Sequence, residues 1–140
     1  MNTEAAAPKI LFLVDDDPDD QEIFQEALRL IDKSIVCYTA TDGKDAIDKL
    51  KDSLILPDVL FLDLNMPVMN GKDCLKAIKS DKDLRRIPVI VYSTSSAEKE
   101  KTNCLSLGAI HYISKPPQFN MLVSKLQETL LIDWDRRVAS

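Results

Sequence analysis

The chain has 140 residues, of which 45% are hydrophobic and 29% are charged, and its formal net charge at pH 7 is −5. This length and composition are typical of a single globular domain that buries its core without disulfides or a structural metal. The acidic balance argues against a nucleic-acid-binding protein, because such a surface needs basic residues to neutralise phosphates.

The N-terminal sequence MNTEAAAPK has no basic region of the kind that begins a secretion signal, and the apolar run ILFLV ends at three aspartates. That run is too short for a signal peptide or a membrane span, so we expect a cytoplasmic protein. Cys37, Cys74 and Cys104 are far apart and odd in number. We expect them to stay reduced and to pack as small apolar residues.

Short apolar runs alternate along the chain with segments of helical periodicity. The runs KILFLV, SIVCYTA, DVLFLD, PVIVYS and AIHYIS predict strands over residues 9–14, 34–40, 58–63, 88–93 and 109–114. The segments that follow them predict helices over about 18–32, 43–53, 71–80, 95–107 and 118–132. This alternation predicts an α/β fold with a doubly wound, five-stranded parallel sheet covered by helices on both faces.

Each predicted helix has an apolar face that we expect to contact the sheet. The predicted core residues are Ile23, Ala27, Leu28 and Ile31 on the first helix, Ala46, Ile47 and Leu50 on the second, Cys74, Leu75 and Ile78 on the third, Cys104, Leu105 and Leu107 on the fourth, and Phe119, Leu122, Val123, Leu126 and Leu130 on the fifth.

Polar residues end four of the five predicted strands. Asp15 and Asp16 follow the first strand, Asp63 ends the third, Ser93 ends the fourth and Lys115 follows the fifth. Ligands bind at the carboxyl ends of such strands, so these groups meet in one crevice if their strands are neighbours. Three carboxylates with one ammonium repel each other unless a cation neutralises them, and an all-oxygen ligand set favours Mg²⁺.

Asp63 interrupts the apolar stretch FLDLNMP, where an unpaired carboxylate would be costly. Beside Mg²⁺, such a carboxylate can attack phosphorus and become an aspartyl phosphate, while Lys115 and Ser93 bind the phosphoryl oxygens. A structural role is preferred for other residues. His111 lies inside a strand, and Asp17, Asp19 and Asp20 lie beside Pro18 at the start of a helix, where acids favour the helix dipole.

Four motifs, ILFLVDDDP, VLFLDLNMPVMNG, PVIVYSTS and GAIHYISKP, resemble the receiver domain of two-component response regulators. The resemblance covers residues 9–132, leaving tails at 1–8 and 133–140, and implies a flavodoxin-like (βα)₅ fold with strand order 2-1-3-4-5. The run DDDPDDQEIFQEAL is also similar to single-domain regulators associated with phytochromes.

The family resemblance implies a role for each matching residue. Asp63 is the phosphoacceptor and Lys115 binds the phosphoryl group, with Lys115–Pro116 as a cis peptide. Ser93 and Tyr112 are switch residues. Asp16 holds Mg²⁺ directly, Asp15 largely through water, and Asp63 and the backbone carbonyl of Asn65 complete the metal site. Two positions depart from the family pattern: Thr94 is bulkier than usual, and Pro117 replaces a common aromatic residue, whose space Phe119 is expected to fill.

The resemblance also implies partners. A histidine kinase or a histidine phosphotransfer protein would phosphorylate the chain, which would act on a downstream protein without binding nucleic acid or entering a membrane. The final stretch DWDRRVAS is too short for an output domain, so we expect a stand-alone regulator. The apolar residues Met121, Leu131, Ile132 and Trp134 predict either a Trp134 side chain folded over the sheet edge or a homodimer or docked partner on the face of the fourth helix, fifth strand and fifth helix.

Other functions fit the sequence less well. Phosphatases of the haloacid-dehalogenase type carry a second aspartate where this chain has Asn65, and their extra acidic pair follows the nucleophile instead of preceding it. A receiver-like binding module that is never phosphorylated usually lacks one of the acids or the lysine. A flavodoxin-like cofactor carrier would place phosphate beside DDDPDD, which would repel it. We therefore expect a signalling protein whose only catalysis is its own phosphorylation and slow dephosphorylation.

Overall fold

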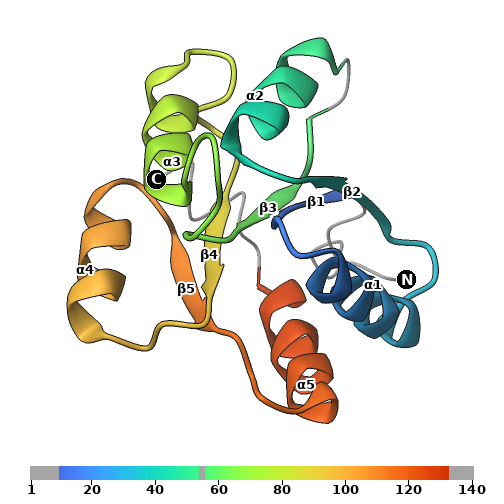
Figure 1. Ribbon diagram of the computed structural model, residues 1–140. Coiled ribbons are helices and arrows are strands. Elements are labelled where there is room, and N and C mark those ends of the chain that lie inside the picture. Colours follow the sequence, from blue (N-terminus) through green and yellow to red (C-terminus); the bar gives the residue numbers. More distant parts are fainter. Residues whose placement is uncertain (1–9, 54–55, 133–140) are drawn as a thin grey trace.

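A computed structural model describes residues 10–53 and 56–132 (Figure 1). One parallel sheet has the strand order β2-β1-β3-β4-β5. The elements, in chain order, are β1 (Ile10–Val14), α1 (Pro18–Ile31), β2 (Val36–Ala40), α2 (Gly43–Asp52), β3 (Val59–Leu62), α3 (Gly71–Ser80), β4 (Val89–Ser93), α4 (Glu98–Ser106), β5 (His111–Ser114) and α5 (Phe119–Leu130). The predicted fold class and strand order are confirmed.

The helices cover both faces of the sheet, with α1 and α5 on one side and α2, α3 and α4 on the other (Figure 1). Successive residues of β1 therefore enter different cores. Leu11 and Leu13 pack with α1 and α5, whereas Phe12 and Val14 pack with the other three helices. Because helices cover both faces, nearly every residue of the central strands β1, β3 and β4 is buried, and the strands do not alternate between apolar and polar residues.

The helix residues predicted to contact the sheet are buried or partly buried, with three exceptions. On α1 the core position belongs to Phe24, whereas Ile23 is 45% exposed. The Phe24 ring meets the edges of Phe61 and Tyr92, with centroids 5.0 Å and 5.5 Å apart, so burying it gains more apolar area than burying Ile23. Leu105 on α4 and Phe119 on α5 are also exposed.

The three cysteines are free thiols, as predicted. Cys74 and Cys104 are buried in the core between the sheet and α2, α3 and α4, and Cys37 is half-buried on β2. Burial raises the pKa of Cys37 and of Cys74 to about 12, so both stay protonated and unreactive at neutral pH.

Gly71 begins α3 directly beside the end of β3. Its N–H donates to the carbonyl oxygen of Leu64 at 2.9 Å. A Cβ atom at this position would lie 2.2 Å from the backbone oxygen of Asp63 and 2.6 Å from the Cα atom of Leu64. Only glycine allows the helix to approach the strand end this closely, and this approach fixes the backbone of Asp63.

Gly71→Ala is expected to lower the free energy of unfolding by about 2–3 kcal/mol, because backbone atoms must move to admit the methyl group. Urea unfolding measures this loss. Lys76→Ala, on the exposed side of α3, is the matched control and should change stability by less than about 0.5 kcal/mol. Equal stability of the two variants would contradict the close approach.

Candidate functional site

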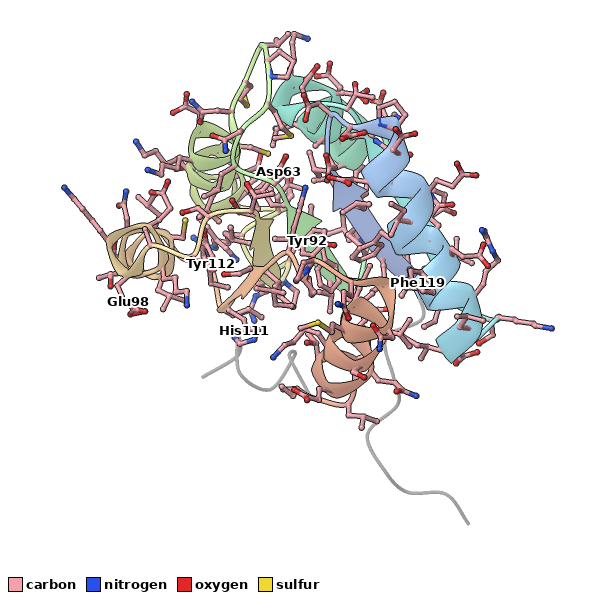
Figure 2. All side chains as sticks on the ribbon, turned by 60° about the horizontal axis from the view of Figure 1, so that its bottom comes forward. Asp63, Tyr92, Glu98, His111, Tyr112 and Phe119 are labelled. Carbon is pink, nitrogen blue, oxygen red and sulfur yellow. The ribbon has the colours of Figure 1, made fainter. Side chains whose placement is uncertain are left out.

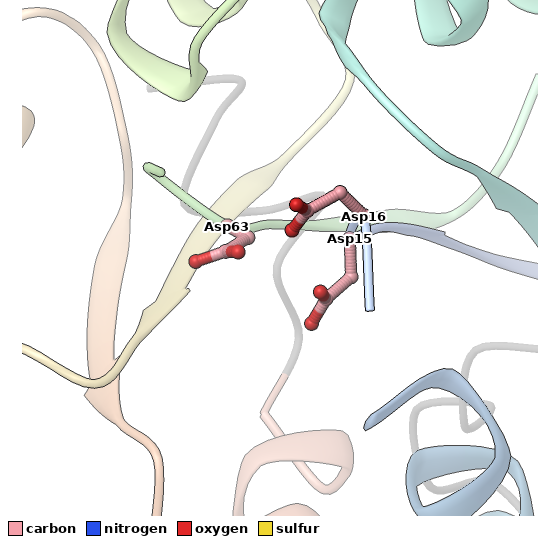
Figure 3. Close-up of side chains that lie close together, drawn as sticks. All are labelled: Asp15, Asp16 and Asp63. Atoms are coloured by element: carbon pink, nitrogen blue, oxygen red, sulfur yellow. The ribbon is translucent and has the colours of Figure 1, made fainter. Parts of the chain in front are cut away.

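The carboxyl ends of β1 and β3 bring three aspartates together. Asp15, Asp16 and Asp63 each offer a carboxylate oxygen, and these oxygens all lie within 4.8 Å of one another (Figure 3). The Asp63 N–H donates to the Val14 carbonyl at 2.9 Å, which places the two strand ends side by side. Asp15 is fully buried, Asp63 is 6% exposed and Asp16 is open to solvent. The predicted convergence of these acids is confirmed.

Lys115 reaches the same crevice from the end of β5. Its ammonium nitrogen lies 2.9 Å from an oxygen of Asp15, 2.9 Å from an oxygen of Asp20 and 3.9 Å from an oxygen of Asp63. It also lies 5.2 Å from the centre of the Tyr92 ring, where the ring face attracts a cation. The charge of the lysine is therefore compensated by these carboxylates.

The sequence did not predict that Asp20 belongs to this site. The sequence assigns it to the start of a helix, and its N–H does donate to the N-cap residue Asp17. Its side chain, however, points back to Lys115, which is 95 residues away in the sequence. No spacing rule could have found this contact, because it depends on the angle at which α1 leaves β1.

Burial controls the ionisation of the acids. Desolvation, with the neighbouring charges of Asp15 and Asp16 adding to it, raises the pKa of Asp63 to about 6, although Lys115 and the Leu64 N–H act in the opposite direction. Desolvation also raises the pKa of Asp15. For Lys115, desolvation lowers the pKa, but the hydrogen bonds to Asp15 and Asp20 outweigh it, so its pKa stands above the usual value.

The donor set fits a hard divalent cation. Every side chain in the cluster offers oxygen. The carboxylate oxygens lie within 4.8 Å of one another, so a cation between them would relieve the repulsion of their negative charges. Both oxygens of Asp15 already accept hydrogen bonds, from the Asp17 N–H at 3.0 Å and from Lys115, which suits contact with a metal through water. Asp16 is exposed and suits direct contact. Asn65 follows β3 on the surface, and its part as a carbonyl ligand stays a prediction.

The two predicted switch residues are joined through the backbone of Ser95. The Ser93 hydroxyl, fully buried at the end of β4, accepts a hydrogen bond from the Ser95 N–H at 3.2 Å. The Tyr112 hydroxyl donates to the Ser95 carbonyl at 2.9 Å, and the Ser114 hydroxyl donates to the same oxygen at 3.2 Å. Tyr112 lies on β5 beside the core of α2, α3 and α4 (Figure 2).

The segment after Lys115 differs from the implied one. No peptide bond in residues 10–53 and 56–132 is cis, so the prediction of a cis Lys115–Pro116 bond is wrong. The trans form is the lower-energy form of an X–Pro bond by about 0.5–1 kcal/mol unless its surroundings select the other. Phe119 is 39% exposed, and its filling of the space left by the missing aromatic residue stays a prediction.

A nearly buried aspartate flanked by an acidic pair and a lysine, at the carboxyl edge of a 2-1-3-4-5 sheet, defines a receiver domain. Residues 11–127 match the response regulator receiver domain, and the chain belongs to this family. This membership sets it apart from the haloacid-dehalogenase-type phosphatases considered above.

Several relatives share the domain. Response regulator Rcp1 of Synechocystis sp. is 31% identical over 134 residues, which cover 91% of this chain and 90% of that protein. A protein-glutamate methylesterase/protein-glutamine glutaminase of Clostridium acetobutylicum is 39% identical over 123 residues, and CpxR of Escherichia coli is 34% identical over 120 residues. Each of these two matches covers 86% of this chain but only 34% and 48% of the respective protein.

Solved structures give the same result. The phosphorylated cyanobacterial phytochrome response regulator RcpA superposes with a TM-score of 0.80 at 34% identity, covering 88% of this chain and 91% of that one. The Mn²⁺-bound form of Rcp1 gives a TM-score of 0.76 at 30% identity, with 86% and 91% covered. The predicted similarity to phytochrome-associated regulators is confirmed.

Across the described part of the chain, no helix combines the length and the apolar character needed to cross a membrane. The cytoplasmic location stays a prediction.

Ionisation of Asp63 is expected to destabilise the metal-free protein. A carboxyl group whose pKa rises from 3.8 to about 6 on folding favours the folded state below pH 3.8 and loses that contribution as the pH rises through 6. The stability of Asp63→Asn relative to wild type should therefore increase by about 2–3 kcal/mol between pH 4 and pH 8. Urea unfolding in EDTA measures the difference, and a difference independent of pH would contradict the desolvation of Asp63.

Proposed function

We propose that the chain is a stand-alone response regulator that accepts a phosphoryl group on Asp63 in a Mg²⁺-dependent reaction. The observation that carries the proposal is the cluster of Asp15, Asp16 and Asp63 with the Lys115 ammonium 3.9 Å from the phosphoacceptor. The match to Rcp1 over 90% of its length supports the stand-alone assignment, and the phosphorylated RcpA and Mn²⁺-bound Rcp1 support the chemistry.

The donor is the phosphohistidine of a histidine kinase or a phosphotransfer protein. An Asp63 oxygen attacks phosphorus, the new O–P bond forms as the P–N bond breaks, and the imidazole leaves with the bonding electrons. The Leu64 N–H, 2.9 Å from one Asp63 oxygen, holds the carboxylate in orientation during the attack. Mg²⁺, when held by Asp15, Asp16, Asp63 and the Asn65 carbonyl, supplies charge neutralisation at the phosphoryl oxygens.

Lys115 and Ser93 then bind the other phosphoryl oxygens. Lys115 donates from its ammonium. The Ser93 hydroxyl can donate to a phosphoryl oxygen while it still accepts from the Ser95 N–H, so its shift toward the phosphoryl group pulls on Ser95. This movement draws the loop that carries Ser95, whose carbonyl is the acceptor for Tyr112. Phosphorylation therefore acts on a face remote from the charge, by shifting the population between two packings.

The helix α4 is suited to this movement. Of its residues Glu98–Ser106, Cys104 is the buried one, and no side chain caps its N-terminus. Little apolar area and no cap hold the helix in place, so a small displacement of Ser95 can move it. We propose that the altered face of α4, β5 and α5 contacts a downstream protein.

Assembly on this face is a further part of the proposal. Met121 on α5 is 47% exposed, which supports a homodimer or a docked partner there. Leu131 is 80% exposed but lies on the side of α5 that faces Ile31 and Ile35. Ile132 is half-buried and packs against the core of α1 and α5. Trp134, which was predicted to cover the sheet edge or join the interface, lies outside the described residues.

Incubation with acetyl phosphate and Mg²⁺ should add one phosphoryl group to the protein. Intact mass spectrometry measures the added mass, which should be missing for Asp63→Asn and after addition of EDTA. Asp52→Asn, an exposed carboxylate on α2, is the control and should be labelled like wild type. Labelling of Asp63→Asn to the wild-type level would rule out Asp63 as the acceptor. It would also favour a receiver-like module whose acceptor is another group.

Ser93→Ala should still be phosphorylated on Asp63 but transmit poorly, because the hydroxyl that links the phosphoryl group to Ser95 is gone. NMR of the amides of residues 95–114, with and without beryllofluoride as a phosphoryl mimic, should show small shifts for this variant and large ones for wild type. Tyr112→Phe, which removes only one hydroxyl, should show an intermediate pattern. Shifts of wild-type size in Ser93→Ala would show that the coupling bypasses Ser93.

A further inference from the structure

We propose that Asp20 is a positioning residue. It holds the Lys115 ammonium away from Asp63 until a phosphoryl group on Asp63 replaces Asp20 as a partner of the lysine. The inference rests on the proposed function. It concerns a carboxylate of α1 that neither accepts the phosphoryl group nor belongs to the cluster Asp15, Asp16 and Asp63.

The distances show where the lysine rests. The Lys115 nitrogen is 2.9 Å from Asp20 and 2.9 Å from Asp15, which are strong charge-assisted hydrogen bonds, but 3.9 Å from Asp63. The last distance is too long for a hydrogen bond. Two of the three ammonium hydrogens are therefore taken by residues other than the phosphoacceptor.

The free-energy cost of losing the lysine differs between its two partners, Asp15 and Asp20. The Asp15 side chain is fully buried, so losing the lysine would leave a desolvated charge unpaired. The Asp20 side chain is 36% exposed and can be hydrated in place of the lysine. When Lys115 turns toward a phosphoryl oxygen, the contact that breaks is therefore the one with Asp20.

This competition makes Asp20 a restraint on the phosphorylated state. The Lys115 side chain is only 11% exposed, so its pair with Asp20 is screened less than a surface ion pair and contributes more. Breaking that pair costs free energy, which reduces the net affinity of the site for the phosphoryl group. Removing the Asp20 charge should therefore tighten binding of a phosphoryl mimic and lengthen the lifetime of the aspartyl phosphate.

A variant of a neighbouring residue distinguishes the effect of this contact from the effect of removing a negative charge near the site. Asp19 precedes Asp20 on the same turn of α1, carries the same charge and is exposed. Asp19→Asn removes one negative charge near the site without touching Lys115, so it measures the effect of charge alone. Asp20→Glu keeps the charge and the hydrogen-bonding oxygens and is the conservative rescue.

Beryllofluoride binding in the presence of Mg²⁺, followed by ¹⁹F NMR titration, tests the inference. Asp20→Asn is expected to bind about fivefold more tightly than Asp19→Asn, the gain of a partly buried ion pair that no longer has to be broken. Asp20→Glu should bind like wild type. Binding of Asp20→Asn that equals or falls below that of Asp19→Asn would overturn the proposal, and Asp20→Ser repeats the test if Asp20→Asn does not fold.

A second readout needs no metal and no phosphoryl mimic. In wild type, the ¹H–¹⁵N signal of the Lys115 ammonium should be visible, because its hydrogen bonds slow exchange with water. Asp20→Asn should shift or broaden that signal, and Asp20→Glu should restore it. An unchanged signal in Asp20→Asn would overturn the contact itself. A wild-type protein that neither binds beryllofluoride nor accepts phosphoryl would instead overturn the proposed function, whatever this readout shows.

Discussion

The hydrogen bond between Lys115 and Asp15, at 2.9 Å, joins the fifth strand of the chain to the first across the two strands between them. It pairs a fully buried carboxylate with a nearly buried ammonium, and neither could stay charged there alone. The bond is possible only because the strands end at one level. The register aligns Val14 with Leu62, Leu62 with Val91, and Ser93 with Ser114, so the polar residues that follow meet in one crevice. The apolar strands set this register by burying both faces of the sheet.

The crevice remains short of positive charge. One ammonium faces Asp15, Asp20 and Asp63, with Asp16 beside them. Burial, together with the charges of Asp15 and Asp16, raises the pKa of Asp63 above its usual value. In the function proposed above, a divalent cation would stabilise this site, and a phosphoryl group would take the place of Asp20 as a partner for the lysine. The loop at Ser95 connects that event to Tyr112 because two side chains from β5 share its carbonyl oxygen. Stability and signalling therefore draw on the same few contacts.

Much of this arrangement could be predicted from the sequence. The alternation of elements predicts the fold. Asp15, Asp63 and Lys115 follow strands and Ser93 ends one, and these strand ends must share one edge. The features that could not be predicted depend on the angles between helices and strands and on side-chain packing in the core. The choice of Phe24 over Ile23 for the core rests on the aromatic contacts of Phe24 with Phe61 and Tyr92, and helical periodicity alone does not decide between adjacent residues. Asp20 meets Lys115 because of how α1 crosses the sheet edge, and the trans Lys115–Pro116 bond departs from the family pattern.

The central claim is that Asp15, Asp16 and Asp63 form one cation site. Titration with Mn²⁺ tests it directly, because the paramagnetic ion broadens NMR signals only of nearby nuclei. Substoichiometric Mn²⁺ should broaden the amides of Asp16, Asp63 and Asn65 first and leave those of Val36 and Lys125 sharp, Mg²⁺ should reverse the effect, and Asp16→Asn should abolish it. Broadening spread evenly over the exposed acids, or unchanged in Asp16→Asn, would contradict the site.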